Sequence, residues 1–129
     1  MFDAHYVPAA LKTDLAVYSR DGNKLGKVSE VMVDLLRGRV EFAIASFGGF
    51  LGLGQKYHPL PVGLLDYRQD KGGSVVSAEP ALIDGSPAYR VDDAPLFDAA
   101  YGDRLYSYYG LRRPEPDSLG RADFTTRDA

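Results

Sequence analysis

The sequence predicts an all-β domain, built as a small, strongly bent β-barrel of about five to six strands with short C-terminal helices. Three observations lead to this prediction. Short β-favouring segments alternate with turn signals through the first half of the chain. One of these segments changes its period-two phase midway, which is typical of a bulged or sharply bent strand. The second half carries short helix signals and many aromatic residues instead.

The first two predicted strands flank a tight turn. Residues 14–19 favour β-structure, and Asp21-Gly22 after them is a strong turn signal. In the following strand, Val28 lies on one alternation phase and Val31 lies on the other. A change of phase within one strand predicts a β-bulge or a sharp bend around Ser29 and Glu30.

The third predicted strand has the clearest alternation of the chain. Val40, Phe42 and Ile44 share one phase, while Glu41 and Ala43 share the other. Because successive side chains of a strand point to opposite faces, the pattern places Val40 beside Phe42 and turns Glu41 away from both.

Turn and edge signals bound the remaining strands. Asp34 ends the second strand before a turn at Gly38, where aspartate commonly accepts backbone hydrogen bonds. Pro59 and Pro61 cannot donate to a β-ladder, so the fourth strand is expected to be short or to lie at an edge. A fifth strand is expected to be entered at Gly73.

The chain after Glu79 predicts helices. Pro80 suits the first position of a short helix, and Asp92 or Asp93 suits the cap of a second helix that begins near Ala94. Four apolar or aromatic residues recur at helical spacing before Gly110, which is a typical helix terminator. They are Tyr101, Leu105, Tyr108 and Tyr109.

These signals divide the chain into four parts. Residues 1–12 are expected to be a flexible N-terminal segment, and residues 13–80 form the barrel. Residues 81–111 form a helical and aromatic extension that packs on the barrel. Residues 112–129 are polar, contain two prolines and predict a disordered tail.

Composition narrows the functional classes. The net charge of -3 makes nucleic-acid binding unfavourable, because phosphate neutralisation dominates that affinity. The absence of cysteine excludes disulfides, thiolate metal sites and cysteine nucleophiles. No apolar run approaches the roughly 18 to 20 residues of a membrane span, and the N-terminus lacks a signal-peptide pattern. We therefore expect a cytoplasmic protein with no membrane insertion.

A glycine-rich stretch, FGGFLGLGQKYHPLP (residues 47–61), raises the question of phosphate binding. Gly49 and Gly54 have the spacing of a phosphate loop, but Gln55 stands where that loop needs lysine. Tyr57 likewise replaces the third glycine of a dinucleotide fingerprint. The stretch is therefore predicted to be a hairpin loop between two strands.

The tip of this loop is apolar. Its large side chains are Phe50, Leu51 and Leu53. They suit either closure of the open end of the barrel or contact with a second subunit or another partner. We favour closure of the core, because apolar surface is mostly buried where it can be.

Few residues in the sequence carry chemistry. His5 and His58 have no helically spaced partner, so neither is expected to bind a metal. No serine lies in a Gly-x-Ser-x-Gly elbow, and no nucleophile and base can be paired. The sequence therefore predicts no catalytic residue, no cofactor and no metal site, and the protein is expected not to be an enzyme.

Basic residues follow the predicted sheet. They are Lys24, Lys27, Arg37, Arg39 and Lys56. Acidic residues are interleaved with them, so a solvated sheet face is the favoured interpretation. An RNA-binding face formed by Lys24, Lys27 and Arg39 is the alternative.

Two long motifs together resemble the PRC-barrel family. They are DGNKLGKVSEVMVD and RGRVEFAIASFGGFLGLGQKYHPLP, and the later ALIDGSPAY and YSYYG resemble an extension seen in stand-alone bacterial members. The resemblance implies a small bent barrel. It also implies a docking or regulatory role, as in the cytoplasmic part of the photosynthetic reaction-centre H subunit and the C-terminal domain of the ribosome maturation factor. Neither specific role carries over, because the sequence has no membrane helix and no second barrel.

Three functional hypotheses follow. The first is a non-enzymatic protein-interaction module that forms a homodimer or binds an unknown protein partner. Its candidate interface residues are Phe50, Leu51, Leu53, Phe97 and Tyr108. The second is an RNA- or ribosome-associated factor that uses Lys24, Lys27 and Arg39. The third is a small-ligand-binding domain with a pocket under the YSYYG helix.

Overall fold

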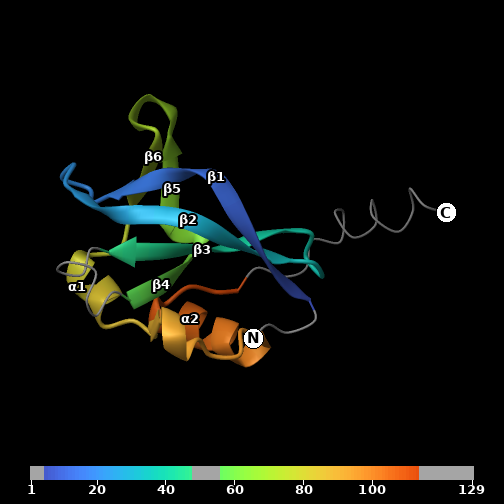
Figure 1. Ribbon diagram of the computed structural model, residues 1–129. Helices are drawn as coiled ribbons and strands as arrows, with labels where there is room; N and C mark the ends of the chain where they lie inside the picture. The colour runs from blue at the N-terminus through green and yellow to red at the C-terminus, as the bar shows by residue number, and fades with distance from the viewer. Residues whose placement is uncertain (1–4, 48–55, 114–129) are drawn as a thin grey trace.

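The computed structural model describes residues 5–47 and 56–113. Its main feature is one seven-stranded sheet in the order β5-β6-β1-β2-β3-β4-β7 (Figure 1). The strands are β1 (Tyr6–Tyr18), β2 (Lys24–Asp34), β3 (Arg39–Phe47), β4 (Lys56–Pro61), β5 (Leu65–Arg68), β6 (Gly73–Val76) and β7 (Tyr89–Arg90). Two α-helices follow the strands, α1 (Pro80–Asp84) and α2 (Ala99–Tyr108). The prediction of a mainly β fold with short C-terminal helices is confirmed.

The sheet differs from the prediction in strand number and closure. Seven strands replace the expected five to six, partly because β7 adds a two-residue pairing to β4. The chain after β4 forms a 3-10 turn over Val62–Leu64 and then the short strand β5, which was not predicted. Among the described residues, β5 and β7 end the strand order without pairing to each other, so the closed barrel is not confirmed.

Strand β1 is much longer than the sequence predicted. It begins at Tyr6, and its pairing with β2 runs from Tyr6↔Asp34 onward. Residues 6–12 of the segment that we expected to be flexible therefore belong to the sheet. Pro8 and the alanines beside it carry little β-propensity, so only the pairing with β2 reveals this strand.

The predicted bulge in β2 is confirmed. Val28 pairs with Ala45 and Glu30 pairs with Ile44, so Ser29 is an extra residue without a partner on β3. A bulge increases the local bend of a strand, which explains the change of alternation phase in the sequence.

A second bulge, in β3, was not predicted. Val33 pairs with Val40 and Met32 pairs with Phe42, so Glu41 is the extra residue. The bulge reverses the phase predicted for the start of β3. Glu41 is fully buried on the side of Phe42, while Val40 points outward and is 39% exposed.

Two core clusters lie on the two faces of the sheet, as alternating residues of β3 show. Phe42 and Ile44 belong to the cluster that α2 covers, whereas Ala43 and Ala45 belong to the other (Figure 1). The α2-side cluster consists of Tyr6, Met32, Phe42, Ile44, Phe97, Tyr101, Leu105 and Tyr106. The opposite cluster consists of Val17, Val28, Ala43, Ala45, Leu60, Leu64, Val76, Ile83 and Tyr109.

The helix boundaries confirm some predictions and correct one. Pro80 starts α1 as predicted, and Gly110 follows α2 with a positive φ of 68°. The predicted cap at Asp92 or Asp93 is wrong, because both residues lie in a 3-10 turn. Asp98 caps α2 instead, and its carboxylate accepts a hydrogen bond from the Tyr101 amide at 2.9 Å.

The proline-containing strand lies next to the sheet edge. β4 pairs with β3 along its whole length, but β7 reaches only Lys56 and Tyr57. Pro59 and Pro61 therefore stand beyond the end of β7, where a missing amide donor breaks no ladder bond.

Candidate functional site

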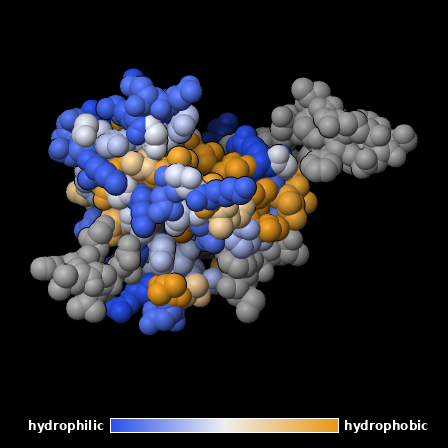
Figure 2. All heavy atoms as spheres, turned by 45° about the horizontal axis from the view of Figure 1, so that its top comes forward, coloured by the Kyte–Doolittle hydropathy of each residue, from blue (hydrophilic) through white to orange (hydrophobic). Residues whose placement is uncertain are grey.

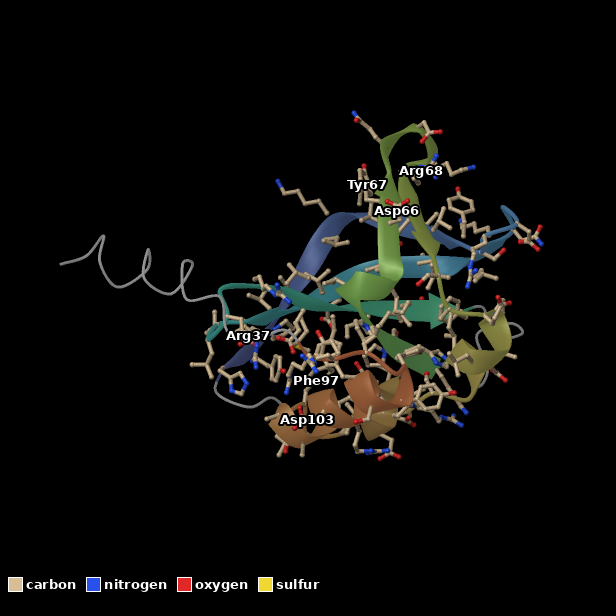
Figure 3. All side chains as sticks on the ribbon, turned by 180° about the vertical axis from the view of Figure 1, so that it is seen from behind. Arg37, Asp66, Tyr67, Arg68, Phe97 and Asp103 are labelled. Carbon is tan, nitrogen blue, oxygen red and sulfur yellow. The ribbon has the colours of Figure 1, made fainter. Side chains whose placement is uncertain are left out.

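A buried polar cluster lies where one end of the sheet meets α2. Two carboxylates with no solvent exposure form its centre, Glu41 from the β3 bulge and Asp34 from the end of β2. The bulge brings Glu41 inward, and the turn after β2 brings Asp34 beside it. Figure 3 shows Arg37 at this end of the sheet and Asp103 on α2 below it.

One oxygen of Glu41 accepts three hydrogen bonds. Its Oε1 accepts from the Tyr6 hydroxyl at 2.8 Å and from Arg113 Nη2 and Nε at 2.8 and 3.1 Å. The other oxygen, Oε2, accepts no hydrogen bond among the described residues. Arg113 thus compensates a charge that would be very unfavourable if it were buried alone.

The remaining surroundings of Arg113 also suit a guanidinium. Its Nη1 donates to Asp103 Oδ1 at 2.6 Å and lies 3.4 Å from the Ala99 carbonyl oxygen. The guanidinium carbon lies 5.9 Å from the ring centre of Tyr6 and 5.5 Å from that of Tyr106. These distances permit cation–π attraction to both rings.

Gly102 on α2 makes room for this guanidinium. A Cβ at position 102 would overlap Arg113 Nη2 and would lie 3.1 Å from the Tyr6 hydroxyl oxygen. A glycine inside a helix weakens the helix relative to alanine. Its place here is explained by the space that the arginine occupies.

Asp34 joins the cluster to the β2–β3 turn. Its Oδ1 accepts from the amides of Leu36 at 2.9 Å and Arg37 at 3.2 Å, and its Oδ2 accepts from Arg37 Nη1 at 2.7 Å. The predicted role of Asp34 in accepting backbone hydrogen bonds is confirmed.

The two central carboxyl groups have opposite pKa shifts. Burial raises the pKa of Glu41, and hydrogen bonding to Asp34 favours its protonated form further. Burial also acts to raise the pKa of Asp34, but hydrogen bonds from Glu41 and Arg37 outweigh it, so that the pKa of Asp34 lies below its ordinary value. A protonated Glu41 could donate to Asp34, whereas two ionised carboxylates could not. Asp34 is therefore the more acidic of the two groups. The hydrogen bonds from Arg113 and Tyr6 oppose the rise of the Glu41 pKa, so the charge of Glu41 depends on these two partners.

The basic and phenolic members of the cluster keep their protons. Burial alone would lower the pKa of Arg113, but the hydrogen bond to Glu41 raises it. Burial and the Glu41 hydrogen bond raise the pKa of Tyr6, and burial raises the pKa of Tyr106 to about 12. The cluster therefore offers fixed charges and hydrogen-bond partners rather than a nucleophile.

His58 and Ser86 form a second buried pair. It has the residues of a catalytic dyad, but its hydrogen bond runs in the opposite direction. The Ser86 hydroxyl donates to the Ile83 carbonyl at 2.7 Å, and His58 Nδ1 lies 3.1 Å from Ser86 Oγ. Because a hydroxyl has one proton, Nδ1 must be the donor to Ser86. His58 therefore does not activate this serine as a base.

The candidate interface residues are not brought together. Phe50, Leu51 and Leu53 lie outside the described residues. The prediction that Phe97 lies at an interface is wrong. Phe97 is 1% exposed inside the α2-side cluster and offers no surface to a second copy. Tyr108 is half-buried, and its hydroxyl donates to the carbonyl of Leu82.

The ligand pocket predicted under the YSYYG segment stays a prediction. Tyr106 borders a groove of about 350 Å³ together with Val62 and Leu111. Tyr106 packs in the α2-side cluster, and Tyr109 packs in the opposite one. The Tyr101 hydroxyl donates to the Pro87 carbonyl at 2.9 Å. These side chains serve packing and local hydrogen bonds.

The basic residues proposed for RNA do not form one patch. Lys27 pairs with Asp14 at 3.1 Å. Lys24 begins β2, whereas Arg39 pairs with Asp34 at the other end of that strand. At the usual rise of a strand, the two ends lie about 30 Å apart.

Two features of the cluster were missed from the sequence. Glu41 is a charged residue within an otherwise apolar strand, and charged residues are rarely buried without a partner. The charge of Glu41 within an apolar strand was the signal that could have indicated a buried ion pair. Arg113 was assigned to the polar tail 112–129, which is corrected here, because it is 72 residues from Glu41 and yet hydrogen-bonded to it. Residues 114–129 lie outside the described part of the chain.

The face of the sheet opposite α2 carries an exposed apolar surface near the β2–β3 turn, which the sequence analysis also missed. Val7 pairs with Val33, and Val33 pairs with Val40, so these three valines form a row on one face. The adjoining turn adds Leu35 and Leu36, which are 53% and 59% exposed. We call these five residues the valine face.

The valine face continues into an apolar groove. Val31 and Ala43 follow in the next row of pairs, and they line a groove of about 250 Å³. The groove also contains Leu65 and Tyr67 of β5. Figure 2 shows apolar surface between hydrophilic areas on the side of the molecule that carries β1 and the β5–β6 hairpin.

Comparison with known proteins assigns most of the sheet to one family. A family model described as the PRC-barrel domain matches residues 13–82. A search of curated proteins found no match. Within the described residues, no helix is long and apolar enough to cross a membrane, and no group of three or more His, Cys, Asp or Glu could hold a metal ion.

Proposed function

Because this chain belongs to the PRC-barrel family, a non-catalytic domain family, we propose that it is a non-enzymatic docking module that associates with a second copy of itself. The family match covers more than half of the 129 residues. The observation that carries the proposal is the valine face, an apolar surface on strands whose other side is fully used for the core.

Among the described residues, 5–47 and 56–113, no element covers the valine face. Val7, Val40 and Leu36 are 40%, 39% and 59% exposed, although each belongs to or adjoins the central strands. Scattered apolar residues are normal on a protein surface, but a cross-strand row beside a groove is a contiguous patch. Contiguous apolar patches of this kind mark interaction surfaces.

A second copy is the partner that fits this face best. The five residues of the valine face are uncharged, so two copies related by a two-fold axis place no like charges against each other. Valine side chains on a flat row lose little rotamer freedom when they are buried. A domain of this size also has a modest core of its own, which favours burial across an interface.

Sedimentation velocity from about 1 to 100 µM tests the proposal, because self-association depends on concentration by mass action. The test variant is Leu36→Asp combined with Val40→Asp, which places two negative charges on the valine face of each subunit. Both residues are exposed, so we expect the fold to remain intact in far-UV circular dichroism. The dimer dissociation constant should rise at least tenfold, which corresponds to about 1.4 kcal/mol.

Val91→Asp is the matched control. Val91 is 72% exposed and lines a different groove, which it shares with Ile44 and Phe97 of the α2-side cluster. It should sediment like the wild type. A wild-type protein that stays monomeric at the highest concentration rules out self-association. A dimer that the double variant leaves unchanged rules out the valine face.

A further inference from the structure

We propose that the buried cluster contains a guanidinium-recognition site, which Arg113 of the same chain fills. We call it the Glu41 pocket, and its walls are Tyr6, Glu41, Gly102, Asp103 and Tyr106. Its core lies on the α2 side of the sheet, although Tyr106 borders a groove that Val40 of the valine face also lines. The site does not depend on the docking function proposed above. Its ligand class is the guanidinium group of an arginine side chain.

The acceptors of the pocket match a planar, multidentate cation. Glu41 Oε1 accepts from Nε and Nη2 of Arg113, while Asp103 Oδ1 accepts from Nη1. All three nitrogens of the guanidinium are therefore engaged. A lysine ammonium is a single donor centre and cannot reach these acceptors together, so the arrangement selects for guanidinium.

The walls of the pocket come from elements other than the segment that carries its ligand. Tyr6 lies on β1, Glu41 on β3, and Gly102, Asp103 and Tyr106 lie on α2. Strand pairing holds the first two, and the core holds Tyr6 and Tyr106. The pocket should therefore persist when Arg113 is removed.

The pocket also retains acceptor capacity. Glu41 has no solvent exposure, and its Oε2 receives no hydrogen bond from the described residues, although Arg37 Nε lies 3.9 Å from it. Gly102 leaves the space that a Cβ would take from Arg113. An empty pocket would thus contain a buried carboxylate, two aromatic rings and free volume, which together favour uptake of an external guanidinium.

A short tether gives Arg113 its advantage over external ligands. The Leu111 amide donates to the Tyr106 carbonyl at 2.9 Å, and the Gly110 amide donates to the Ser107 carbonyl at 3.1 Å. These bonds close the end of α2 and fix the chain just before Arg113. A tethered ligand has an effective concentration of about millimolar or higher, so free ligands compete only when Arg113 is absent.

The experiment is a titration of ¹⁵N-labelled Arg113→Ala with methylguanidinium chloride at pH 7.5, followed through the amide signals of Gly102 and Asp103. We expect saturable shifts and a rise of the melting temperature. Methylammonium chloride at equal ionic strength is the matched control cation and should bind at least about tenfold more weakly. The wild type should show no saturable shift over the same range, because Arg113 already occupies the pocket.

The combined variant Arg113→Ala with Glu41→Gln tests whether Glu41 provides the affinity. It should lose at least about tenfold in affinity for methylguanidinium, as expected for loss of charge-assisted hydrogen bonds. If Arg113→Ala alone is largely unfolded, methylguanidinium should refold it, whereas methylammonium should not. The proposal is overturned by an absence of saturable binding to Arg113→Ala, by equal responses to the two cations, or by binding that survives Glu41→Gln.

Discussion

Arg113 Nη2 lies 2.8 Å from Glu41 Oε1, although the two residues are 72 positions apart in the chain. The contact ties the segment after α2 to the bulge of β3. It also explains how a carboxylate with no solvent exposure is accommodated between two apolar residues of a central strand. Both residues can be varied singly and together, so the strength of the contact is measurable.

Arg113→Ala should lower the free energy of unfolding by about 2 to 4 kcal/mol, because it removes the cation that hydrogen-bonds to the buried Glu41 and leaves only Arg37 Nε at 3.9 Å. Glu41→Gln should cost less, about 1 to 2 kcal/mol, since the amide oxygen still accepts a hydrogen bond. Urea unfolding of both single variants and the double variant gives the coupling energy, expected at about 1 to 3 kcal/mol. Arg112→Ala is the control and should change stability by under about 0.5 kcal/mol. Additive single effects would show that the two side chains do not interact.

Asp34→Ala should destabilise the protein more than Asp34→Asn. Alanine removes the acceptors of the Leu36 and Arg37 amides and of the Arg37 guanidinium, which should cost about 2 to 4 kcal/mol. Asparagine keeps an oxygen that accepts from the backbone amides. It replaces the charged oxygen that faces the Arg37 guanidinium with an NH₂ group, so an intermediate loss is expected. Chemical unfolding of the three proteins gives this ranking, and equal losses for the two variants would contradict the role assigned to the turn.

Gly26→Ala should cost at least about 2 kcal/mol, because overpacking against backbone cannot be relieved by a rotamer change. A Cβ at position 26 would overlap the Ser46 carbonyl oxygen of the neighbouring strand. Gly63 provides the matched control, since a Cβ there meets no atom within 4 Å. Gly63→Ala should stay within about 0.5 kcal/mol of the wild type in thermal or urea unfolding. Similar losses at both positions would mean that the close approach at Gly26 is not the cause.

The stability of the protein should fall below pH 6.5 partly through His58. Burial lowers the pKa of His58, nearby Lys56 lowers it further, and Asp84 opposes both. The unfolded chain therefore takes up a proton at a higher pH than the folded one. The stabilising effect is complete above the unfolded pKa of 6.5 and is lost as the pH falls toward the folded pKa.

Comparison of the wild type with His58→Gln isolates this effect from Glu41 and Asp34, which titrate in both proteins. Between pH 7.5 and pH 5, the wild type should lose more unfolding free energy than the variant. Urea unfolding at several pH values measures the difference between the two curves. Parallel curves would show that His58 is not held neutral by the fold.

Much of the fold follows from local patterns in the sequence. The phase change after Val28 revealed the first bulge, and Asp34 before Gly38 marked a turn in which the aspartate accepts backbone hydrogen bonds. Gly110 marked the end of α2. These features can be predicted from the sequence because each depends on the backbone preferences of a few consecutive residues. The combination of such motifs also indicated the PRC-barrel family, which the family match confirms.

The candidate site depended on the tertiary structure. Alternation alone placed Glu41 on the face opposite Phe42, and only the register between β2 and β3 shows that Glu41 is the extra residue of a bulge. Pairing with β2 likewise makes a strand of the segment that begins at Tyr6, and Tyr6 then reaches Glu41 at 2.8 Å.

The sequence by itself determined where β2, β3, their connecting turn and one helix end would lie, because those follow from local backbone preferences. The tertiary structure decided which charge would be buried and which cation would compensate it. Burial of Glu41 is tolerable only with Arg113 and Tyr6 around it, 72 and 35 positions away in the chain. Contacts at such separations leave no periodic trace in the sequence, since they depend on how the sheet and α2 come together.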